Sequence, residues 1–284
     1  KRKGNREMYQ GHPGNKWLAA LVLLSTPFSA CPEESAADLA QELTNPVADL
    51  VTVPTQMNLD RNVGLADDGT KLTTNIQPVI PFEINKNWNL ITRTIVPVIH
   101  QDDLFPGAGS QFGLGDINLS LFLSPTKPTA GGLTWGAGPV FLLPTATDSL
   151  LGGKKWGAGP AAVGLVLKGP WTVGMLANHI WSFAGDDDRD DISNTFMQPF
   201  VAYTWPSAWT ASVQSETSYN WETDQWSVPV NVALSKLVMI GKVPVSLQGA
   251  GWAIGPSLRT QARRAFVSGC RRTSCCPSSG NVIG

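Results

Sequence analysis

Apolar and polar side chains alternate strictly along much of this chain, and the stretch Trp209–Trp221 shows it most clearly. One face carries Trp209, Val213 and Trp221, and the opposite face is entirely polar. A period of two indicates a β-strand. Twelve steps at about 3.3 Å cover roughly 40 Å, or about 28–30 Å of height at a tilt of about 40–45°. That height is close to the ~25 Å apolar band of a membrane β-barrel.

Three further stretches repeat the alternation: Leu72–Ile84, Gly115–Ser124 and Trp226–Ser235. Their polar faces consist mainly of Ser, Thr, Asn, Gln and Gly, with few charges. A soluble β-sandwich also alternates, but its polar face meets bulk water and should carry Lys and Glu. The pattern therefore favours a barrel with a narrow polar lumen.

Composition excludes several other classes of protein. Only 15% of the 284 residues are charged, and 28 Gly and 21 Pro are present, which excludes a coiled coil, a helical repeat and a highly charged disordered chain. No apolar run reaches the roughly 18 residues of a membrane-spanning helix. Residues 38–251 hold 11 basic and 19 acidic residues, a net charge of −8, which does not fit nucleic-acid binding. We expect no cofactor, because no helix follows the Gly-Ala-Gly-Pro segments at 136–139 and 157–160.

The fold class predicted is all-β, an up-and-down antiparallel transmembrane β-barrel of about 12 strands. Short connections after every second strand alternate with mostly longer ones, as in outer-membrane barrels, where the short turns are periplasmic. An even strand count is required, and eleven strands are visible. They lie near 50–59, 71–84, 88–100, 113–124, 133–145, 155–168, 171–183, 196–205, 209–221, 225–234 and 243–251.

Ten prolines inside these strands argue against regular ladders, because proline has no N–H to donate. Bulges or strand ends account for some of them, and the sequence offers no account of all ten. They are Pro54, Pro78, Pro81, Pro97, Pro139, Pro144, Pro160, Pro199, Pro229 and Pro244.

The first 37 residues have the pattern of an export signal. Residues 1–7 read as upstream read-through before Met8, and residues 8–37 as a cleaved signal peptide with the apolar core Trp17–Leu24 and a cleavage site after Ala37. A buried helix and a lipoprotein box ending at Cys31 are the alternatives. Export predicts a Gram-negative outer-membrane location, with the barrel-assembly machinery and outer-membrane lipid as partners.

The barrel is expected to occupy residues 38–254, because the sequence changes character after Gly255. Residues 255–284 contain five Arg and three of the four Cys, with neither strand nor helix period. A metal or disulfide knot lacks ligand spacing, so the expectation is a disordered tail. We also consider a reading-frame shift: codons for Ala265–Ser279, displaced by one nucleotide, can encode an alternating strand, which would be the twelfth. Re-reading the nucleotides from Ala250 onward tests this hypothesis.

Candidate solute-contacting residues are the polar side chains on the predicted inward faces. A twelve-strand lumen lies between the filled eight-strand and open sixteen-strand sizes, so conductance should be small. Aromatic residues at strand ends are the predicted membrane-interface girdles. The lumen candidates are Gln77, Arg93, Asp116, Asn118, Gln214, Glu216 and Asn231, and the interface aromatics are Trp171, Trp181, Trp209, Tyr219, Trp221 and Trp226.

Several motifs resemble the "MetA-pathway of phenol degradation" family of bacterial outer-membrane proteins. The resemblance extends from about Leu39 to Gly251. It implies an exported barrel and transport of small aromatic or other hydrophobic compounds. Members of that family end in a strand rich in Phe and Leu, which this chain lacks. The motifs are Asn75–Phe82, Trp88–Thr94, Phe112–Asn118, Gly136–Pro139, Pro144–Thr147 and Ile180–Gly185.

Enzymatic chemistry is not expected. His179 and Ser182 are residue types found in a lipase-like catalytic set, but an odd spacing puts them on opposite faces of a strand. A calcium loop in the Asp-rich run lacks its mid-loop Gly and closing Glu, which leaves divalent bridging to lipopolysaccharide or a solvated loop. The run holds Asp186, Asp187, Asp188, Asp190 and Asp191.

The predicted function is passive uptake or export of small hydrophobic or aromatic solutes through the lumen. The alternatives are a structural or adhesion barrel without transport, and a soluble periplasmic β-protein. Deleting Gly185–Asp191 separates adhesion, which should be lost, from flux, which should persist.

Overall fold

A computed structural model describes residues 35–63, 69–104, 107–241, 243–254 and 262–270, all within the compact unit 34–284. For residues 62–63, 250–254 and 262–270 it describes the backbone only. The elements are α1 (Ala36–Glu42), β1 (Val51–Thr52), β2 (Thr55–Val63), β3 (Gly69–Ile76), β4 (Val79–Asn85), β5 (Trp88–Asp102), β6 (Ser110–Leu114), β7 (Ile117–Pro125), β8 (Leu133–Leu143), β9 (Lys155–Lys168), β10 (Trp171–Gly185), β11 (Ser193–Thr204), β12 (Trp209–Ser215), β13 (Thr217–Asn220), β14 (Gln225–Ser227), β15 (Val230–Ile240), β16 (Val243–Ile254) and β17 (Ala262–Cys270).

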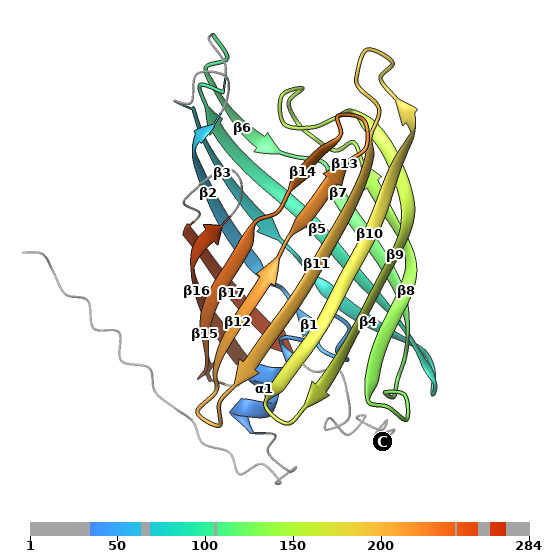
Figure 1. Cartoon of the computed structure of the whole chain (residues 1–284), viewed down its shortest axis with the longest axis vertical. Helices are drawn as coiled ribbons and strands as arrows, with labels where there is room; N and C mark the ends of the chain where they lie inside the picture. The colour runs from blue at the N-terminus through green and yellow to red at the C-terminus, as the bar shows by residue number, and fades with distance from the viewer. Residues whose placement is uncertain (1–34, 64–68, 105–106, 242, 255–261, 271–284) are drawn as a thin grey trace, which may run out of the picture. The chain divides into compact units, whose positions relative to one another are not determined.

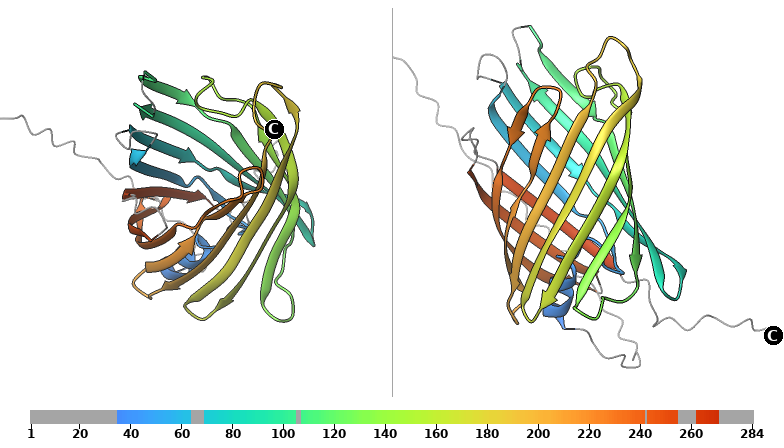
Figure 2. Two further views of the ribbon diagram at one scale, coloured as in Figure 1. Left: turned by 45° about the horizontal axis from the view of Figure 1, so that its top comes forward. Right: turned by 45° about the vertical axis from the view of Figure 1, so that its right-hand side comes forward.

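All the strands belong to one antiparallel sheet, whose long strands tilt and curve around an interior (Figures 1 and 2). The eleven predicted strands are confirmed, and so is the all-β, up-and-down antiparallel architecture. Followed from β2, the pairings pass through β3, β5, β7, β8, β9, β10, β11, β12, β15, β16 and β17, and β17 pairs again with β2.

Strand β17 differs from the expectation of a disordered tail beginning at residue 255. Its backbone pairs with β16 from Val245 to Ala250 and with β2 from Thr55 to Leu59. Ladder hydrogen bonds need only backbone groups, so a segment without side-chain alternation can fill the twelfth position. The strand expected to be lost is therefore present between residues 262 and 270, and the sheet extends beyond the predicted boundary at 254. The reading-frame hypothesis stays a prediction, since residues 271–284 lie outside the described residues.

The N-terminal predictions fall almost entirely outside the described residues, which begin at Ser35. Ser35 caps α1, because its hydroxyl accepts a hydrogen bond from the Asp38 N–H at 3.1 Å. Ala36 and Ala37 form the first turn of this helix, so the boundary predicted after Ala37 falls inside α1. Read-through, signal peptide and cleavage site all remain predictions.

Short turns and α1 lie at the same end of the sheet (Figure 1). Gly169 and Pro170 join β9 to β10, and Gly169 adopts φ +56°, a left-handed conformation that suits glycine. The α1 helix is held at this end by the Gln41 side chain, which donates to the Gly169 carbonyl at 2.7 Å. The longer connections, including residues 144–154 and 186–192, lie at the opposite end. The predicted alternation of loop lengths is therefore present.

Four of the ten prolines lie in interruptions or at strand ends. Pro54 separates β1 from β2, Pro78 separates β3 from β4, Pro229 precedes β15, and Pro144 follows β8. Three of these prolines act as acceptors across the gaps: the Gln77 N–H donates to Pro54 O at 2.8 Å, the Thr94 N–H to Pro78 O at 3.0 Å and the Glu216 N–H to Pro229 O at 3.2 Å. The interruptions therefore preserve hydrogen bonding where proline cannot donate. The other six prolines lie within strands.

The two faces of the sheet differ as the alternation predicts. Outward side chains include exposed Val, Leu, Met, Phe and Trp on nearly every strand. The interior holds an apolar cluster around Ile91, Phe122, Val140 and Leu176, and Val47, from the segment after α1, is buried within it. Of the helices within the described residues, none is long and apolar enough to cross a membrane.

Candidate functional site

A cavity of about 540 Å³ lies between the inward face of the sheet and the segment 40–54, here named the inner segment. The inner segment contributes both apolar and polar side chains, among them Leu43, Asn45 and Leu50. Thr44 ties it to the wall through a 2.9 Å hydroxyl contact with Thr172 of β10. The lumen is therefore partly filled by the chain itself, and the cavity is the space that remains.

Six of the seven predicted lumen residues line this cavity. The seventh, Asn231, is buried on β15 outside the cavity lining, and its Nδ2 has no partner among the described residues. Their inward placement follows from the period of two, whereas contact with a solute remains a prediction. The six are Gln77, Arg93, Asp116, Asn118, Gln214 and Glu216.

The charged residues Arg93 and Glu216 each belong to a polar chain along the wall. The Arg93 Nη2 donates to Gln77 Oε1 at 2.8 Å. On the other side, the Gln198 amide donates to Gln214 at 3.2 Å, and Gln214 donates to Glu216 at 3.5 Å. Arg93 and Glu216 also interact electrostatically with each other. The cavity thus has a cation on one wall and an anion on another.

Strand interruptions position three of these side chains. Gln77 lies in the gap between β3 and β4, Asp116 between β6 and β7, and Glu216 between β12 and β13. At a gap the backbone leaves the regular ladder, which lets a side chain approach the centre of the lumen. Because Gln77 and Glu216 donate backbone N–H groups to proline carbonyls, these departures leave neither N–H unpaired.

Asp116 holds the β8–β9 loop (residues 144–154) rather than standing free in the lumen. Its Oδ1 accepts from the Ala146 N–H at 3.1 Å, and its Oδ2 accepts from the Gly153 N–H at 2.7 Å. A Cβ at Gly152 would lie 2.5 Å from Asp116 Oδ1, so only glycine fits there. The loop is therefore anchored to the wall by Asp116, which itself lines the cavity.

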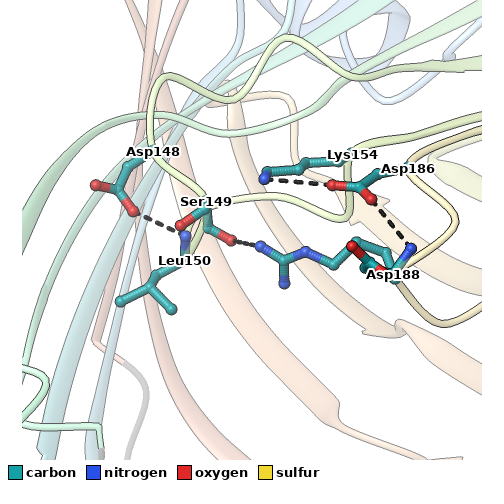
Figure 3. A network of polar contacts seen from close by, with 7 residues as sticks. Asp148, Ser149, Leu150, Lys154, Asp186 and Asp188 are labelled. Atoms are coloured by element: carbon teal, nitrogen blue, oxygen red, sulfur yellow. Dashed lines mark hydrogen bonds and ion pairs between the residues drawn. The ribbon is translucent and has the colours of Figure 1, made fainter.

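A second set of contacts joins this loop to the β10–β11 loop (residues 186–192), as Figure 3 shows. Lys154 pairs with Asp186 at 3.4 Å, Lys155 pairs with Asp191 at 3.0 Å, and the Arg189 guanidinium donates to the Ser149 carbonyl.

The backbone N–H of Asp188 and then Lys154 hold the pKa of Asp186 below its ordinary value. Hydrogen bonds from Lys155 and then Ser182 lower the pKa of Asp191. Both carboxylates are therefore held ionised by their loop partners.

The Asp-rich run does not gather into a metal-binding cluster in the described part of the chain, which has no group of three or more His, Cys, Asp or Glu placed to hold an ion. Asp186 and Asp191 face different lysines, and Asp186 also accepts the Asp188 N–H at 3.0 Å. Bridging of divalent ions to lipopolysaccharide by this loop, with Asp186, Asp187, Asp188, Asp190 and Asp191, stays a prediction.

The predicted interface aromatics lie on the outer face, near both ends of the strands. Toward the α1 end, Trp171 stacks edge-on with Tyr203 at 4.9 Å between ring centroids, and Lys236 lies over Trp209. Toward the other end, Tyr219 contacts both Trp221 and Trp226. All five tryptophans of the prediction (Trp171, Trp181, Trp209, Trp221 and Trp226) are exposed, and Tyr219 is half-buried.

His179 belongs to this aromatic group, and its hydroxyl partner is Thr195 rather than Ser182. Its Nδ1 lies 2.7 Å from Thr195 Oγ1, its ring centroid lies 4.0 Å from that of Trp181, and its Nε2 has no partner among the described residues. Ser182 instead donates to Asp191 at 3.1 Å. The expected separation of His179 and Ser182 on opposite faces is present, and the absence of enzymatic activity remains a prediction.

The sequence leaves open whether the lumen is open or plugged by residues 38–49, and sequence reasoning missed the apolar part of the cavity wall. Phe196 and Phe200 of β11 line the cavity beside Leu176 of β10. Their spacing of four residues on a strand places them on the same face as the polar Gln198. This spacing can be recognised in the sequence. The inner segment has no comparable signal, because Val47 and its neighbours follow no period.

Comparison with solved structures identifies the fold. The chain is similar to the COG4313 outer membrane channel from Pseudomonas putida F1, at 15% identity and a TM-score of 0.59, over 78% of this chain and 94% of that one. This protein has the fold of an outer-membrane β-barrel. Outer membrane phospholipase A from Escherichia coli (14% identity, TM-score 0.43, 83% and 98% of the two chains) and the Bordetella autotransporter BrkA β domain (11%, 0.47, 78% and 97%) are less similar. No family model and no curated protein sequence matches, so membership of the MetA-pathway family stays a prediction.

Proposed function

We propose that this protein resides in the outer membrane and lets small aromatic or other hydrophobic solutes cross passively through its lumen. The observation that supports this function best is the cavity. Within about 540 Å³ it combines apolar side chains such as Leu176 and Phe200 with polar groups such as Arg93 and Gln214. Sites for small molecules have volumes of about 300–1,000 Å³ and combine apolar walls with placed polar groups. In this cavity more than half of the lining residues are polar.

The outer surface supports a membrane location over a soluble periplasmic protein. Large apolar side chains are exposed on the strands, including Val173, Met175, Val213, Leu234 and Leu247. In water such a surface would be an aggregation hazard, whereas lipid tails solvate it. Aromatic residues near both ends match the two interfacial girdles of a membrane barrel. In this setting the short turns face the periplasm, and lipid, lipopolysaccharide and the assembly machinery are the partners.

Arg93 and Glu216 supply the polar contacts in this proposal, and the apolar wall supplies dispersion contacts to the ring or chain of the solute. The inner segment narrows the route. The barrel size and this partial filling both predict small conductance.

Swelling of solute-loaded liposomes tests the proposal. The full chain is reconstituted beside protein-free liposomes, and the initial swelling rate is measured in isotonic solutions of aromatic solutes and of larger sugars. We expect rates well above those of empty liposomes for single-ring solutes, and a decline with solute size. A rate equal to that of empty liposomes for every solute would reject transport and leave a structural or adhesion barrel.

A further inference from the structure

Two of the three charged residues that line the cavity, Arg93 and Glu216, lie on opposite walls. Arg93 is on β5 and Glu216 is between β12 and β13, and the pairing order separates these positions by five strands in either direction. One route passes through β7, β8, β9, β10 and β11, and the other through β3, β2, β17, β16 and β15. Their electrostatic interaction therefore acts across the lumen.

The walls between the two charges differ in polarity. The β10 and β11 part of one route carries Leu176, Ile180, Phe196 and Phe200, interspersed with Asn178, Asn194 and Gln198. The route through β3, β2, β16 and β15 carries amides and hydroxyls, namely Asn75, Gln56, Gln248, Ser246 and Ser235. A molecule that spans from Arg93 to Glu216 thus has on one side a wall of mixed polarity that includes two phenylalanines, and on the other a wall of amides and hydroxyls.

The chemistry of the two ends defines what such a molecule carries. A guanidinium has five N–H donors in a planar fork that matches a carboxylate, and in the described structure Gln77 is the side-chain acceptor within hydrogen-bond distance of Arg93. Glu216 is an acceptor when ionised, so it pairs with a hydroxyl or an ammonium group. Phe196 and Phe200 offer ring faces and edges to an aromatic body.

We propose that the cavity selects aromatic acids with a second hydrogen-bond donor, the carboxylate at Arg93, the donor at Glu216 and the ring against Phe196 and Phe200. This inference rests on the proposed function, since it names the class of solute for the same lumen. A solute of this class places a carboxylate against the Arg93 guanidinium and a hydrogen-bond donor against the Glu216 carboxylate. A neutral aromatic molecule brings no carboxylate to Arg93.

Flux above that of protein-free liposomes, measured well above the pKa of the benzoic acids, tests the selectivity with three probes: 4-hydroxybenzoate, benzoate and the neutral phenyl β-glucoside. We expect the wild-type protein to favour them in that order. Arg93→Gln should lower the flux of both acids at least about tenfold, as expected for loss of a charge-assisted hydrogen bond, and leave the glucoside unchanged. Glu216→Gln should raise benzoate flux, because a repulsive charge is removed, and should abolish the preference for the hydroxylated acid.

Controls separate this inference from the proposed function. Lys236→Gln removes a positive charge outside the cavity lining and should change no ratio. Arg93→Lys is the second variant, in case Arg93→Gln fails to fold; heat-modifiable gel mobility reports folding. Because Arg93→Lys keeps the charge and loses the planar fork, its ratio of acid flux to glucoside flux should lie between those of the wild type and Arg93→Gln. Equal flux of all three probes, unaffected by either substitution at Arg93, would overturn the selectivity while transport stands. No flux of any probe would overturn transport itself.

Discussion

Asp116→Ala should release the β8–β9 loop from the wall of the lumen. The substitution removes two hydrogen bonds to one carboxylate, from Ala146 at 3.1 Å and from Gly153 at 2.7 Å. Bonds to a charged group contribute about 1.5–3 kcal/mol each, and Asp116 is half-buried, so we take the lower value for both. The loop-closed state then loses about 3 kcal/mol, which raises the population of the opened loop about 10²-fold at about 1.4 kcal/mol per factor of ten.

Limited trypsin digestion of the detergent-solubilised protein measures this opening at Lys154. In the closed loop the Lys154 carbonyl accepts a hydrogen bond from the Asp186 N–H at 3.1 Å, which holds the backbone in place. Cleavage after Lys154 should become about 10²-fold faster in Asp116→Ala. The control Glu83→Gln removes an exposed carboxylate from a strand that does not contact the loop. Unchanged cleavage in Asp116→Ala, or equal acceleration in Glu83→Gln, would refute the anchoring role.

Three further predictions concern packing and pH. Phe122→Ala should lower the free energy of unfolding in urea by about 3–5 kcal/mol, because this side chain is fully buried. A decrease of less than about 1 kcal/mol, as is usual for substitutions at the surface, would contradict the core assignment. Gly159→Ala should prevent heat-modifiable folding, since its Cβ would lie 1.8 Å from a carbonyl oxygen of β10, whereas Gly249→Ala, with open space around it, should fold. Because the pKa values of Asp186 and Asp191 are lowered from 3.8, both stay ionised above that pH and lose their loop contacts only as pH falls through the lowered values. Single-channel current noise should therefore be constant from about pH 5 to 8 and increase below 3.8; an increase already near neutral pH would contradict this.

Alternation predicted the strands because a membrane barrel requires each strand to divide its side chains between lipid and lumen. The same reasoning placed Arg93 and Glu216 inside, where both line the cavity. It did not show that they belong to opposite walls, because that follows from the pairing order of the whole sheet. Nor did it distinguish Asn231 from the six predicted lumen residues that line the cavity: Asn231 is inward and buried but outside the cavity lining.

The features that the sequence did not predict depend on backbone groups or on contacts without a period. Asp116 was expected to meet solute, yet its partners are backbone N–H groups 30 and 37 residues away, which leave no mark in the sequence. The inner segment is held by contacts such as that of Thr44 with Thr172, 128 residues apart. Strand β17 pairs through its backbone, so its lack of alternation hid it.

The central claim, that solute crosses through the cavity, is tested most directly by filling the cavity. Ser212 lines the cavity and Ser227 is exposed outside the lining, so Ser212→Trp and Ser227→Trp add the same side chain inside and outside the lumen. The measurement is liposome flux of benzoate through each variant, after both are shown to fold. We predict that Ser212→Trp reduces the flux to that of empty liposomes while Ser227→Trp leaves it at the wild-type rate. Equal flux through both variants would contradict a route through this cavity.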